Sequence, residues 1–580
     1  MKQKLEYEKY KSKKNLYEKK VNIIASIRLI TFIILLFSFI GKYYYLKNLL
    51  TIIFILSLII FIILIIIHDK YYKIYDYYEK YSKIIETYLK RENGNWKEFK
   101  DTGSDFLENC PYYYQDLDIF GQNSLFQLIS ICKTQGGREK LKERLSNKEY
   151  SNIELKNEQN AIEELSNNPK LIIELNILLD YFDNKNINIS KTFSKIKTEE
   201  KSNTLDIIIS ITCSIICIIL LILGVLKIIK INYFYAIFLF NFMISWLYSY
   251  IFKENFKELE NLIKNYKGIN EIFKKITSES FTSEKLNKMR ARMKDAKDSG
   301  VLLERLDTLN SLRNNLLASF FMNGFFCVNL ILLSTFSNFE KSNLSKIQVG
   351  IAEIEELEAI SSLATIGIIF KNKCMPSLTE NVNINFNDLI HPLLGEKICI
   401  PNSFSSNNGI NIITGSNMGG KTSFLRTIGV NIILMNSGSY VCAKNFSASY
   451  FKVFTSMRVF DDISNGISTF YGELLRIKDM VEYVNKGNML VLIDEIFKGT
   501  NYQDRIYGAK EVIKKLNKDK VIVILTTHDF ELCDQEKVKN YHVQETYNKD
   551  KIVFDYKIKE GKCTSTNARY LMTKLGIINK

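Results

Sequence analysis

An uncharged run of 19 residues at positions 49–67, LLTIIFILSLIIFIILIII, constrains the fold of this chain more than any other feature. A helix rises about 1.5 Å per residue, so a run of this length crosses the roughly 30 Å of hydrocarbon in a bilayer. The preceding run, positions 21–40, is nearly as apolar, and its Arg28 lies close enough to one end to snorkel. Three tyrosines at 43–45 form an interfacial belt at the other end. The two runs predict transmembrane hairpin 1 over residues 21–67.

Two further apolar runs lie at about 207–229 and 231–251, joined by a connection too short to fold. They predict transmembrane hairpin 2 over residues 205–251. A fifth candidate, residues 316–335, carries no charge but contains two asparagines and a central glycine. No cleavable signal peptide is evident, because the first apolar run lacks a small-residue cleavage site and a second run soon follows it.

The composition of the chain adds little to the predicted membrane segments. The chain has 78 Lys and Arg against 63 Asp and Glu, a formal charge of +15, which favours nucleic acid or an anionic membrane surface as partner. Lys, Asn, Ile and Tyr are abundant throughout, so compositional bias explains much of that excess. Ten cysteines are scattered without metal-binding spacing and indicate reduced cytosolic thiols, with Cys213 and Cys217 as buried apolar side chains.

The segment GSNMGGKT at positions 415–422 fits the phosphate-loop pattern GxxxxGK[ST] completely. An apolar β-branched run precedes it and a helical apolar pattern follows it, which is the strand–loop–helix context that the motif requires. Lys421 is predicted to reach the β and γ phosphates of ATP, and Thr422 to offer its hydroxyl to Mg²⁺. The predicted nucleotide-binding residues are Gly415, Ser416, Asn417, Met418, Gly419, Gly420, Lys421 and Thr422.

Two further strand ends carry polar residues. The run MLVLID ends in Asp494 and is followed by Glu495, and the run VIVILTT is followed by His528. Asp494 is predicted to hold Mg²⁺, and Glu495 to orient or deprotonate the attacking water. His528 is predicted to act at the γ-phosphate.

The predicted nucleotide site also determines how the fifth apolar run is interpreted. The lysine-rich segment between Lys2 and Lys20 predicts a cytoplasmic start by the positive-inside rule. An odd number of spans would export the phosphate loop to a side without ATP. Residues 316–335 are therefore predicted to form a buried soluble-domain helix or a membrane-surface helix.

The C-terminal motifs resemble the ATPase domain of the MutS mismatch-repair family. The resemblance rests on TGSNMGGKTSFLRTIGVNIILMNSGSYVCA, DDISNGISTFYGELLRIKDM, LVLIDEIFKGTNYQDRIYGAKEV and TTHDFEL, in the family's order and spacing. It implies that Ser468 lies in a signature loop that engages the γ-phosphate of a partner subunit's nucleotide, in a homodimer. More weakly, residues 116–145 resemble the start of the MutS core domain, and residues 351–364 resemble the lever helix that leads into the ATPase.

The chain also departs from that family. No mismatch-reading domain fits before Asp116, and hairpin 2 lies close to where the family carries its DNA clamp. The basic stretch KLNKMRARMKDAK at 285–297 is interpreted as a solvated or lipid-facing helix face, with contact to a nucleic-acid backbone as the alternative. The family's helical dimerisation extension and its adenine-stacking aromatic, expected near 398–400, look absent.

The predicted fold class is an α/β P-loop NTPase domain of the ABC/MutS type with an all-α core and lever and transmembrane helices. The predicted domains are a basic cytoplasmic N-terminus (1–20), hairpin 1 (21–67), a first core half (68–204), hairpin 2 (205–251), a second core and lever half (252–370) and the ATPase domain (371–580).

The predicted function is that of a multi-pass cell-membrane ATPase with cytoplasmic soluble domains, which hydrolyses ATP with Mg²⁺, contacts lipid and has DNA as a candidate ligand. The alternatives are an ABC-type transport or membrane-remodelling ATPase without DNA binding, and a non-hydrolysing scaffold, which would need a damaged site.

Overall fold

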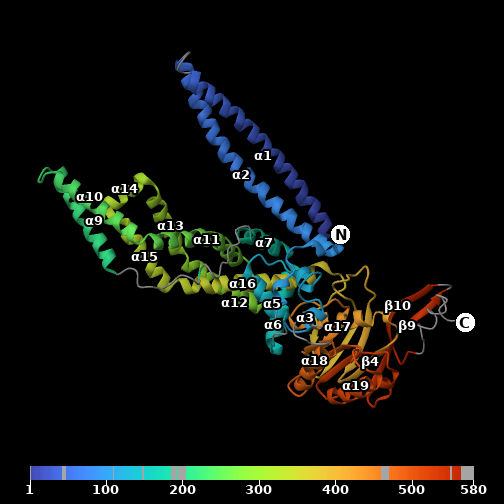
Figure 1. The fold of residues 1–580 in the computed structure, drawn as a ribbon. Helices are drawn as coiled ribbons and strands as arrows, with labels where there is room; N and C mark the ends of the chain where they lie inside the picture. Colours follow the sequence, from blue (N-terminus) through green and yellow to red (C-terminus); the bar gives the residue numbers. More distant parts are fainter. Residues whose placement is uncertain are drawn as a thin grey trace. The chain divides into compact units, whose positions relative to one another are not determined.

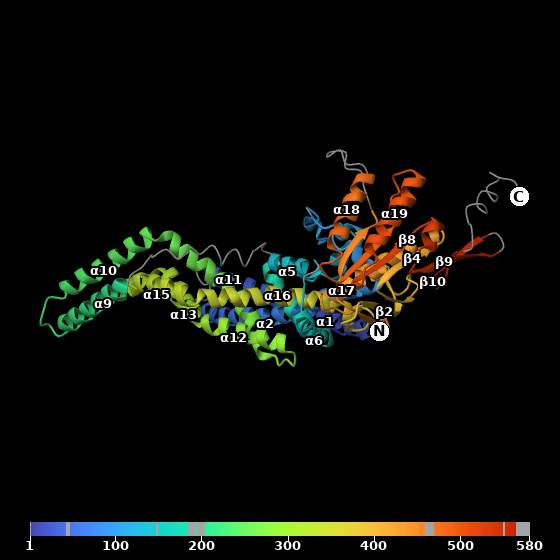
Figure 2. The ribbon, with the colours of Figure 1, turned by 90° about the horizontal axis from the view of Figure 1, so that it is seen from below.

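The structure is a computed structural model that describes residues 2–41, 47–108, 110–146, 149–183, 193, 204–458, 469–548 and 551–563. The chain forms two compact units. The first comprises residues 1–100, 169–177 and 369–371, and the second comprises residues 101–168, 178–368 and 372–580. Figures 1 and 2 show the elements of both.

The first unit is built on two long helices, α1 (Lys2–Gly41) and α2 (Lys47–Asn93), which pack side by side as the blue pair of Figure 1. Each helix is apolar over one half and polar over the other. The residues predicted as a separate N-terminal segment, 1–20, therefore include the first half of α1. The short helix η1 (Asn95–Glu98) follows and buries Trp96.

Tyrosines hold the polar halves of this pair together. Tyr10 stacks on Tyr81 with ring centroids 3.9 Å apart, and Tyr17 stacks on Tyr78 at 5.5 Å. Lys13 lies over the Tyr78 ring at 5.2 Å. The apolar halves, in contrast, leave most of their Ile, Leu and Phe side chains exposed.

The second unit begins with short elements and three core helices: α3 (Tyr113–Asp116), α4 (Leu125–Ile129), α5 (Gln135–Leu145), α6 (Asn152–Asn167) and α7 (Pro169–Asp183), the last shared with the first unit. A capping box starts α6, in which the Ser151 side chain accepts from Glu154 N and Glu154 accepts from Ser151 N. Four helices continue the core: α11 (Lys253–Ser278), α12 (Glu284–Ser299), α13 (Val301–Asn314) and α16 (Leu344–Ile369). Helix α11 buries one stripe at helical spacing, which includes Leu259, Ile263 and Tyr266.

Four further helices of this unit are strongly apolar: α9 (Thr204–Val225), α10 (Asn232–Ile251), α14 (Leu316–Phe326) and α15 (Val328–Ser342). Helix α9 ends four residues earlier than predicted, at a turn in which Lys227 has φ 58°. Among the described residues, α1, α2, α9 and α10 are each long and apolar enough to cross a membrane. The fifth apolar run is not one helix, because it breaks at Cys327 and bends by 85° between α14 and α15.

The C-terminal region is α/β, as predicted. Its six-stranded sheet has the order β10-β9-β4-β8-β7-β6, parallel from β9 to β6, with β10 antiparallel at the edge. The strands are β4 (Gly409–Thr414), β6 (Lys452–Ser456), β7 (Met489–Asp494), β8 (Val521–Thr526), β9 (Val538–Asn548) and β10 (Lys551–Glu560). A second sheet, β1-β5-β2-β3, uses β1 (Ser377–Leu378), β2 (Asn383–Leu389), β3 (Asn402–Asn407) and β5 (Asn445–Ala448).

Helices cover the six-stranded sheet and bury its central strands. On one face Val491 and Ile493 pack into a core shared with α18 (Thr469–Tyr483) and α19 (Tyr502–Leu516). On the other face Leu492 lies against Gly429 of α17 (Lys421–Asn436). The carboxyl ends of β4, β7 and β8 therefore meet at one edge, next to the start of α17.

Candidate functional site

The phosphate loop connects β4 to α17 and takes its shape from glycine. Gly415 and Gly420 have φ of 126° and 88°, a region that favours glycine. A Cβ on Gly415 would also stand 2.5 Å from the Val543 carbonyl oxygen of β9. Between them lies the single 3₁₀ turn η3 (Asn417–Gly419), and the N-terminus of α17 then directs its backbone N–H groups at the loop.

Lys421 is held in this loop by its charge. Its Nζ donates to Gly415 O at 2.6 Å and lies 3.3 Å from His528 Nε2. Burial lowers the pKa of Lys421 below its usual value, while the carboxylates of Glu495 and Asp494 oppose that shift. A buried cation in a loop toward which backbone N–H groups point suits a polyanionic ligand.

Thr422 and Asp494 form an oxygen pair beside it. Thr422 Oγ1 donates to Asp494 Oδ2 at 2.8 Å, and Thr526 Oγ1 donates to Asp494 Oδ1 at 2.6 Å. Hydroxyl and carboxylate oxygens are the donors that Mg²⁺ prefers. Among the described residues no group of three His, Cys, Asp or Glu side chains forms a metal cage. The pair therefore fits a Mg²⁺ that takes its remaining ligands from phosphate and water. Ser416 of the loop has a buried hydroxyl with no hydrogen-bond partner among the described residues, which fits a phosphate oxygen.

Glu495 occupies a strained position. Its φ is 60° and that of Phe497 is also 60°, in a turn directly after β7. Glu495 Oε1 lies 3.1 Å from His528 Nε2, and Lys498 Nζ lies 3.7 Å from Glu495 Oε2. The hydrogen bond from His528, with help from Lys498, lowers the pKa of Glu495 to about 2. Glu495 is thus an ionised carboxylate at the same strand edge as Lys421.

The remaining predicted residues divide into two groups. Met418 is exposed, and the backbone of Asn417, Gly419 and Gly420 completes the loop. Ser468 lies outside the described residues, immediately before the first residue of α18. The structure therefore brings together Lys421, Thr422, Asp494, Glu495 and His528, and Ser468 stays a prediction.

The sequence did not reveal two buried acids that support the site. Glu473 of α18 accepts from Phe497 N at 2.5 Å, so it ties the turn after Glu495 to the helix that follows Ser468. Asp116 of α3 is fully buried and accepts from Thr455 Oγ1 and Arg476 Nη1 at 2.7 and 2.8 Å. Their partners are distant in sequence, and no local motif marks either acid.

Tyr556 was also missed. It belongs to β10, has φ 53° and is half exposed, and its ring lies 3.1 Å from where a Cβ on Gly420 would stand. Asn402 Nδ2 donates to Tyr556 O at 2.9 Å and holds this backbone in place. An aromatic ring therefore borders the phosphate loop on the side opposite β7.

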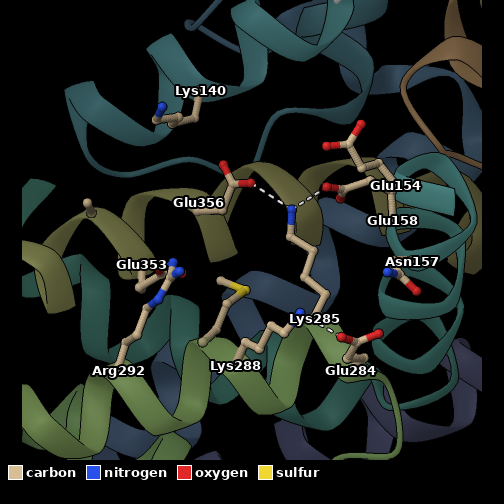
Figure 3. A pocket seen from close by; sticks show the side chains of 12 residues that line it. Lys140, Glu154, Asn157, Glu158, Glu284, Lys285, Lys288, Arg292, Glu353 and Glu356 are labelled. Carbon is tan, nitrogen blue, oxygen red and sulfur yellow. Dashed lines mark hydrogen bonds and ion pairs between the residues drawn. The ribbon is translucent and has the colours of Figure 1, made fainter. Parts of the chain in front are cut away.

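A second cluster of charges lies away from the loop. A pocket of about 390 Å³ lies among α5, α6, α12 and α16 (Figure 3). Lys285 of α12 pairs with Glu158 of α6, and with Glu356 of α16 at 2.8 Å. Arg144 of α5, itself buried, pairs with the same two glutamates at 2.9 and 2.5 Å. We call these four residues the lever network; burial opposes the ionisation of Glu356, but Arg144 and Lys285 outweigh it and hold its pKa at about 2.

The lever network has a direct contact with the phosphate-loop helix. Ser437, the residue after α17, donates through Oγ to Arg144 O at 2.9 Å. Two residues later, Ser439 Oγ donates to Leu363 O of α16 at 2.9 Å. The end of α17 is therefore hydrogen-bonded to two of the helices that the lever network joins.

Known proteins match the region that carries the nucleotide-type site. Residues 411–572 match the model of MutS domain V. The DNA mismatch repair protein MutS of Clostridioides difficile (strain 630) is 31% identical over 229 residues, which cover 37% of this chain and 24% of that protein. The MutS of Aquifex pyrophilus is 31% identical over 229 residues, or 38% of this chain and 26% of that protein.

A MutS2 relative matches as well. The protein "Endonuclease MutS2" of Carboxydothermus hydrogenoformans (strain ATCC BAA-161 / DSM 6008 / Z-2901) is 30% identical over 254 residues, or 42% of this chain and 32% of that protein. This chain thus spans about a quarter to a third of the length of these relatives. The phosphate loop, the strand-end acids and the matched segment agree, and the C-terminal region of this chain is similar to MutS domain V.

Proposed function

We propose that this chain is a membrane-anchored MutS-type ATPase that binds and hydrolyses ATP in a composite dimer site and transmits the change along its lever helix. The observation that carries the proposal is the convergence of Lys421, Thr422, Asp494, Glu495 and His528 at one sheet edge. A buried cation, an oxygen pair that can hold Mg²⁺ and an ionised carboxylate are the groups that phosphoryl transfer requires.

Each side chain has a role that its contacts support. Lys421 balances phosphate charge, and Thr422 with Asp494 would hold Mg²⁺, which supplies further positive charge at the phosphates. Glu495 is ionised and is fixed by its strained turn. It orients the attacking water or accepts a proton from it. His528 contacts both Lys421 and Glu495 and therefore positions the acid relative to the phosphates. The Tyr556 ring beside Gly420 is a candidate to stack on the base.

The dimer follows from the family's signature loop. We propose that Ser468 completes the neighbour's site, and Glu473 supports this assignment because it links the helix after Ser468 to the turn after Glu495. Mixing Lys421→Ala chains with Ser468→Ala chains in one membrane should rebuild one working site per heterodimer. Loss of one donor to phosphate charge costs about 10²–10³ in rate, so partial rescue is measurable. Verified mixtures as inactive as each parent would contradict the dimer.

The membrane assignment rests on side chains that the protein leaves uncovered. The helices α1, α2, α9 and α10 expose rows of Ile, Leu and Phe, as a lipid-facing surface requires. We propose four spans, with the N-terminus and the ATPase region both cytoplasmic. The lever network then offers a path from α17 through Arg144 and Lys285 toward α12.

A DNA ligand and a purely membrane-directed activity remain the two candidate outputs. The names of the MutS relatives concern DNA, whereas three of the six basic side chains in the stretch 285–297 of this chain pair with carboxylates of the protein itself. Lys285 pairs with Glu356, Arg292 Nη1 with Glu353 at 2.5 Å, and Lys288 with Glu284 at 2.6 Å. Those pairs favour transport or membrane remodelling without DNA as the second candidate.

One experiment tests the ATPase and separates the two outputs. In detergent-purified full-length protein, Lys421→Ala should abolish ATP binding, whereas Glu495→Gln should retain ATP binding and lose hydrolysis. Lys518→Ala is the matched control, because this lysine is exposed at the opposite end of β8. Wild-type turnover should be measured with and without duplex, mismatched and branched DNA; stimulation selects DNA, and hydrolysis surviving in Glu495→Gln would reassign the base.

A further inference from the structure

The helix pair α14–α15 has an unusual distribution of apolar surface. Leu316, Leu317 and Phe321 of α14 are 85%, 71% and 54% exposed, on a helix that carries no charge. The other face of α14 packs against α9 and α10, whose own apolar side chains are exposed. Helix α15 differs, because most of its side chains are buried against neighbouring helices. The exposed surface of α14 is therefore continuous with that of α9 and α10.

The break between the two helices frees backbone groups, and the protein itself satisfies them. Cys327 has φ 46°, so the helical ladder stops there. Asn241 Nδ2 of α10 donates to Gly324 O at 3.1 Å, and Ser210 Oγ of α9 donates to Phe326 O at 2.6 Å. After the break, Asn329 N donates to Asn323 Oδ1 at 3.1 Å.

The donors are polar side chains that are buried within apolar helices. Ser210 and Asn241 are fully buried within α9 and α10, and Asn329 Nδ2 adds a bond to Ser245 O of α10 at 3.1 Å. A helix break exposed to water would be satisfied by solvent. In hydrocarbon, irregular backbone is tolerated only where protein groups satisfy it. These internal bonds are thus what a break at membrane depth needs.

Both ends of the pair join the aqueous part of the unit. Before α14, α13 carries the ion pair Asp307–Lys267 at 2.8 Å, and it packs against α15 as well as α11. After α15 the chain enters α16, which carries Glu356 of the lever network. The chain therefore leaves and re-enters the same side.

We propose that residues 316–342 form a re-entrant membrane element: α14 enters the bilayer with Leu316, Leu317 and Phe321 against lipid acyl chains, the chain turns at Cys327, and α15 returns inside the protein. The inference rests on the proposed membrane spans α9 and α10. It places α14, the first part of the fifth apolar run, in lipid without adding a crossing, so the phosphate loop stays on the side of the N-terminus. It also replaces the predicted single helix, because the run breaks at Cys327 and α14 leaves one apolar face uncovered.

Tryptophan quenching by phosphatidylcholine brominated on its acyl chains tests the lipid contact. The chain has two tryptophans, buried Trp96 and Trp246 of α10, which is 58% exposed. Trp96→Phe leaves Trp246 as the reporter of the span. Phe321→Trp in a Trp96→Phe, Trp246→Phe background reports on α14, and Tyr507→Trp on exposed α19 in the same background is the control.

We expect Trp246 and the Phe321→Trp variant to be quenched to within about twofold of each other, since quenching requires acyl-chain contact. The Tyr507→Trp variant should be unaffected. A quenched Trp246 with an unquenched Phe321→Trp variant overturns the re-entrant element and leaves the spans intact. An unquenched Trp246 overturns the membrane proposal itself, and the inference with it.

Thiol labelling separates a re-entrant element from a crossing. Ser311→Cys at the end of α13 and Ser342→Cys at the end of α15 should both resist an impermeant maleimide in intact cells and react after permeabilisation. Lys230→Cys, in the turn between α9 and α10, should react in intact cells. Reaction of only one of the two serine variants from outside would show a fifth crossing and overturn the proposal.

Discussion

The strands of the nucleotide sheet and the apolar helices use nearly the same side chains in opposite surroundings. All six residues of β8 and the first five of β7 are buried by helices of the same region. In α2, Ile52, Ile59 and Ile66 are all exposed. Burial of one such side chain contributes roughly 1.5–3 kcal/mol, so rows of them are not left to water. The difference shows that hydrophobicity alone indicates that side chains need cover from water, and that the protein itself supplies this cover for the strands and not for these helices.

A single charge placed in the strand core and one placed on an exposed apolar helix should have the largest and most different effects. Val491→Asp puts a carboxylate into the centre of β7 and should cost more than about 4 kcal/mol, because no partner is available in that core. The full-length variant should lose ATP binding, measured by nucleotide filter binding. Ile59→Asp on α2 should cost about 2.5–3.5 kcal/mol of membrane insertion and leave ATP binding in the recovered protein intact.

Equal loss of ATP binding in both variants would contradict the distinction. Ile59→Val is the matched control for the helix position, since it changes size and adds no charge.

In the lever network the protein covers charged groups instead of apolar ones. Arg144→Met leaves Glu158 and Glu356 with Lys285 alone, and should destabilise the fold by about 3–5 kcal/mol. The midpoint of thermal unfolding in detergent measures this. Lys140→Met, one turn away on α5 with a half-exposed partner Glu143, should change the stability by less than about 1 kcal/mol. Similar unfolding midpoints for the two variants would show that the lever network does not stabilise the fold.

Glu358 gives a smaller, pH-dependent effect on the same helix. Burial raises its pKa to about 7, although Lys133 N and Thr134 N donate to it at 2.6 and 3.2 Å. The folded state therefore binds the proton more tightly than the unfolded chain, whose pKa is about 4.3, and stability falls as the pH rises from there through about 7.

The Glu358→Gln side chain cannot ionise, so the stability of this variant should not fall over this pH range. Its unfolding midpoint should therefore exceed that of the wild type at about pH 8 and match it near pH 5. Glu356→Gln on the same helix is the control. The low pKa of Glu356, about 2, places its own titration below this window, so the slope there should keep its wild-type value. An unchanged slope in Glu358→Gln would assign the proton to another group.

The smallest effect is expected on the surface of α2. Lys73 pairs with Asp69 at 2.6 Å, and both side chains are mostly exposed. Lys73→Ala should change the unfolding midpoint by the equivalent of less than about 0.5 kcal/mol, since exposed pairs gain little in water. A shift as large as that of Arg144→Met would show that Lys73 is covered by something other than solvent.

The parts that the sequence predicted are those in which neighbours along the chain determine the structure. The phosphate loop needs only Gly415 to Thr422 and the adjoining strand and helix, Asp494 ends an apolar strand, and His528 follows another. Parallel strands then bring those ends together. The α/β region and its candidate site were therefore predictable.

The parts that were missed depend on contacts between distant segments. Glu473 meets Phe497 N, and Asp116 meets Arg476 across 360 positions. The break at Cys327 depends on donors from α9 and α10, which the hydropathy of residues 316–335 cannot reveal. The boundary predicted near residue 20 divides a basic segment from an apolar one, and α1 continues through it without a break.

That uninterrupted helix has a mechanical consequence. In the proposed membrane arrangement about 20 residues span the hydrocarbon, so the 40 residues of α1 would leave roughly 30 Å projecting beyond it, stiffened by tyrosine rings against α2. The described part of α1 has no hinge between its two halves. With one half in lipid, as proposed, a twist of that half would appear as an equal twist of the other half, so the pair would carry torque across the membrane surface as a rigid shaft rather than act as a passive tether.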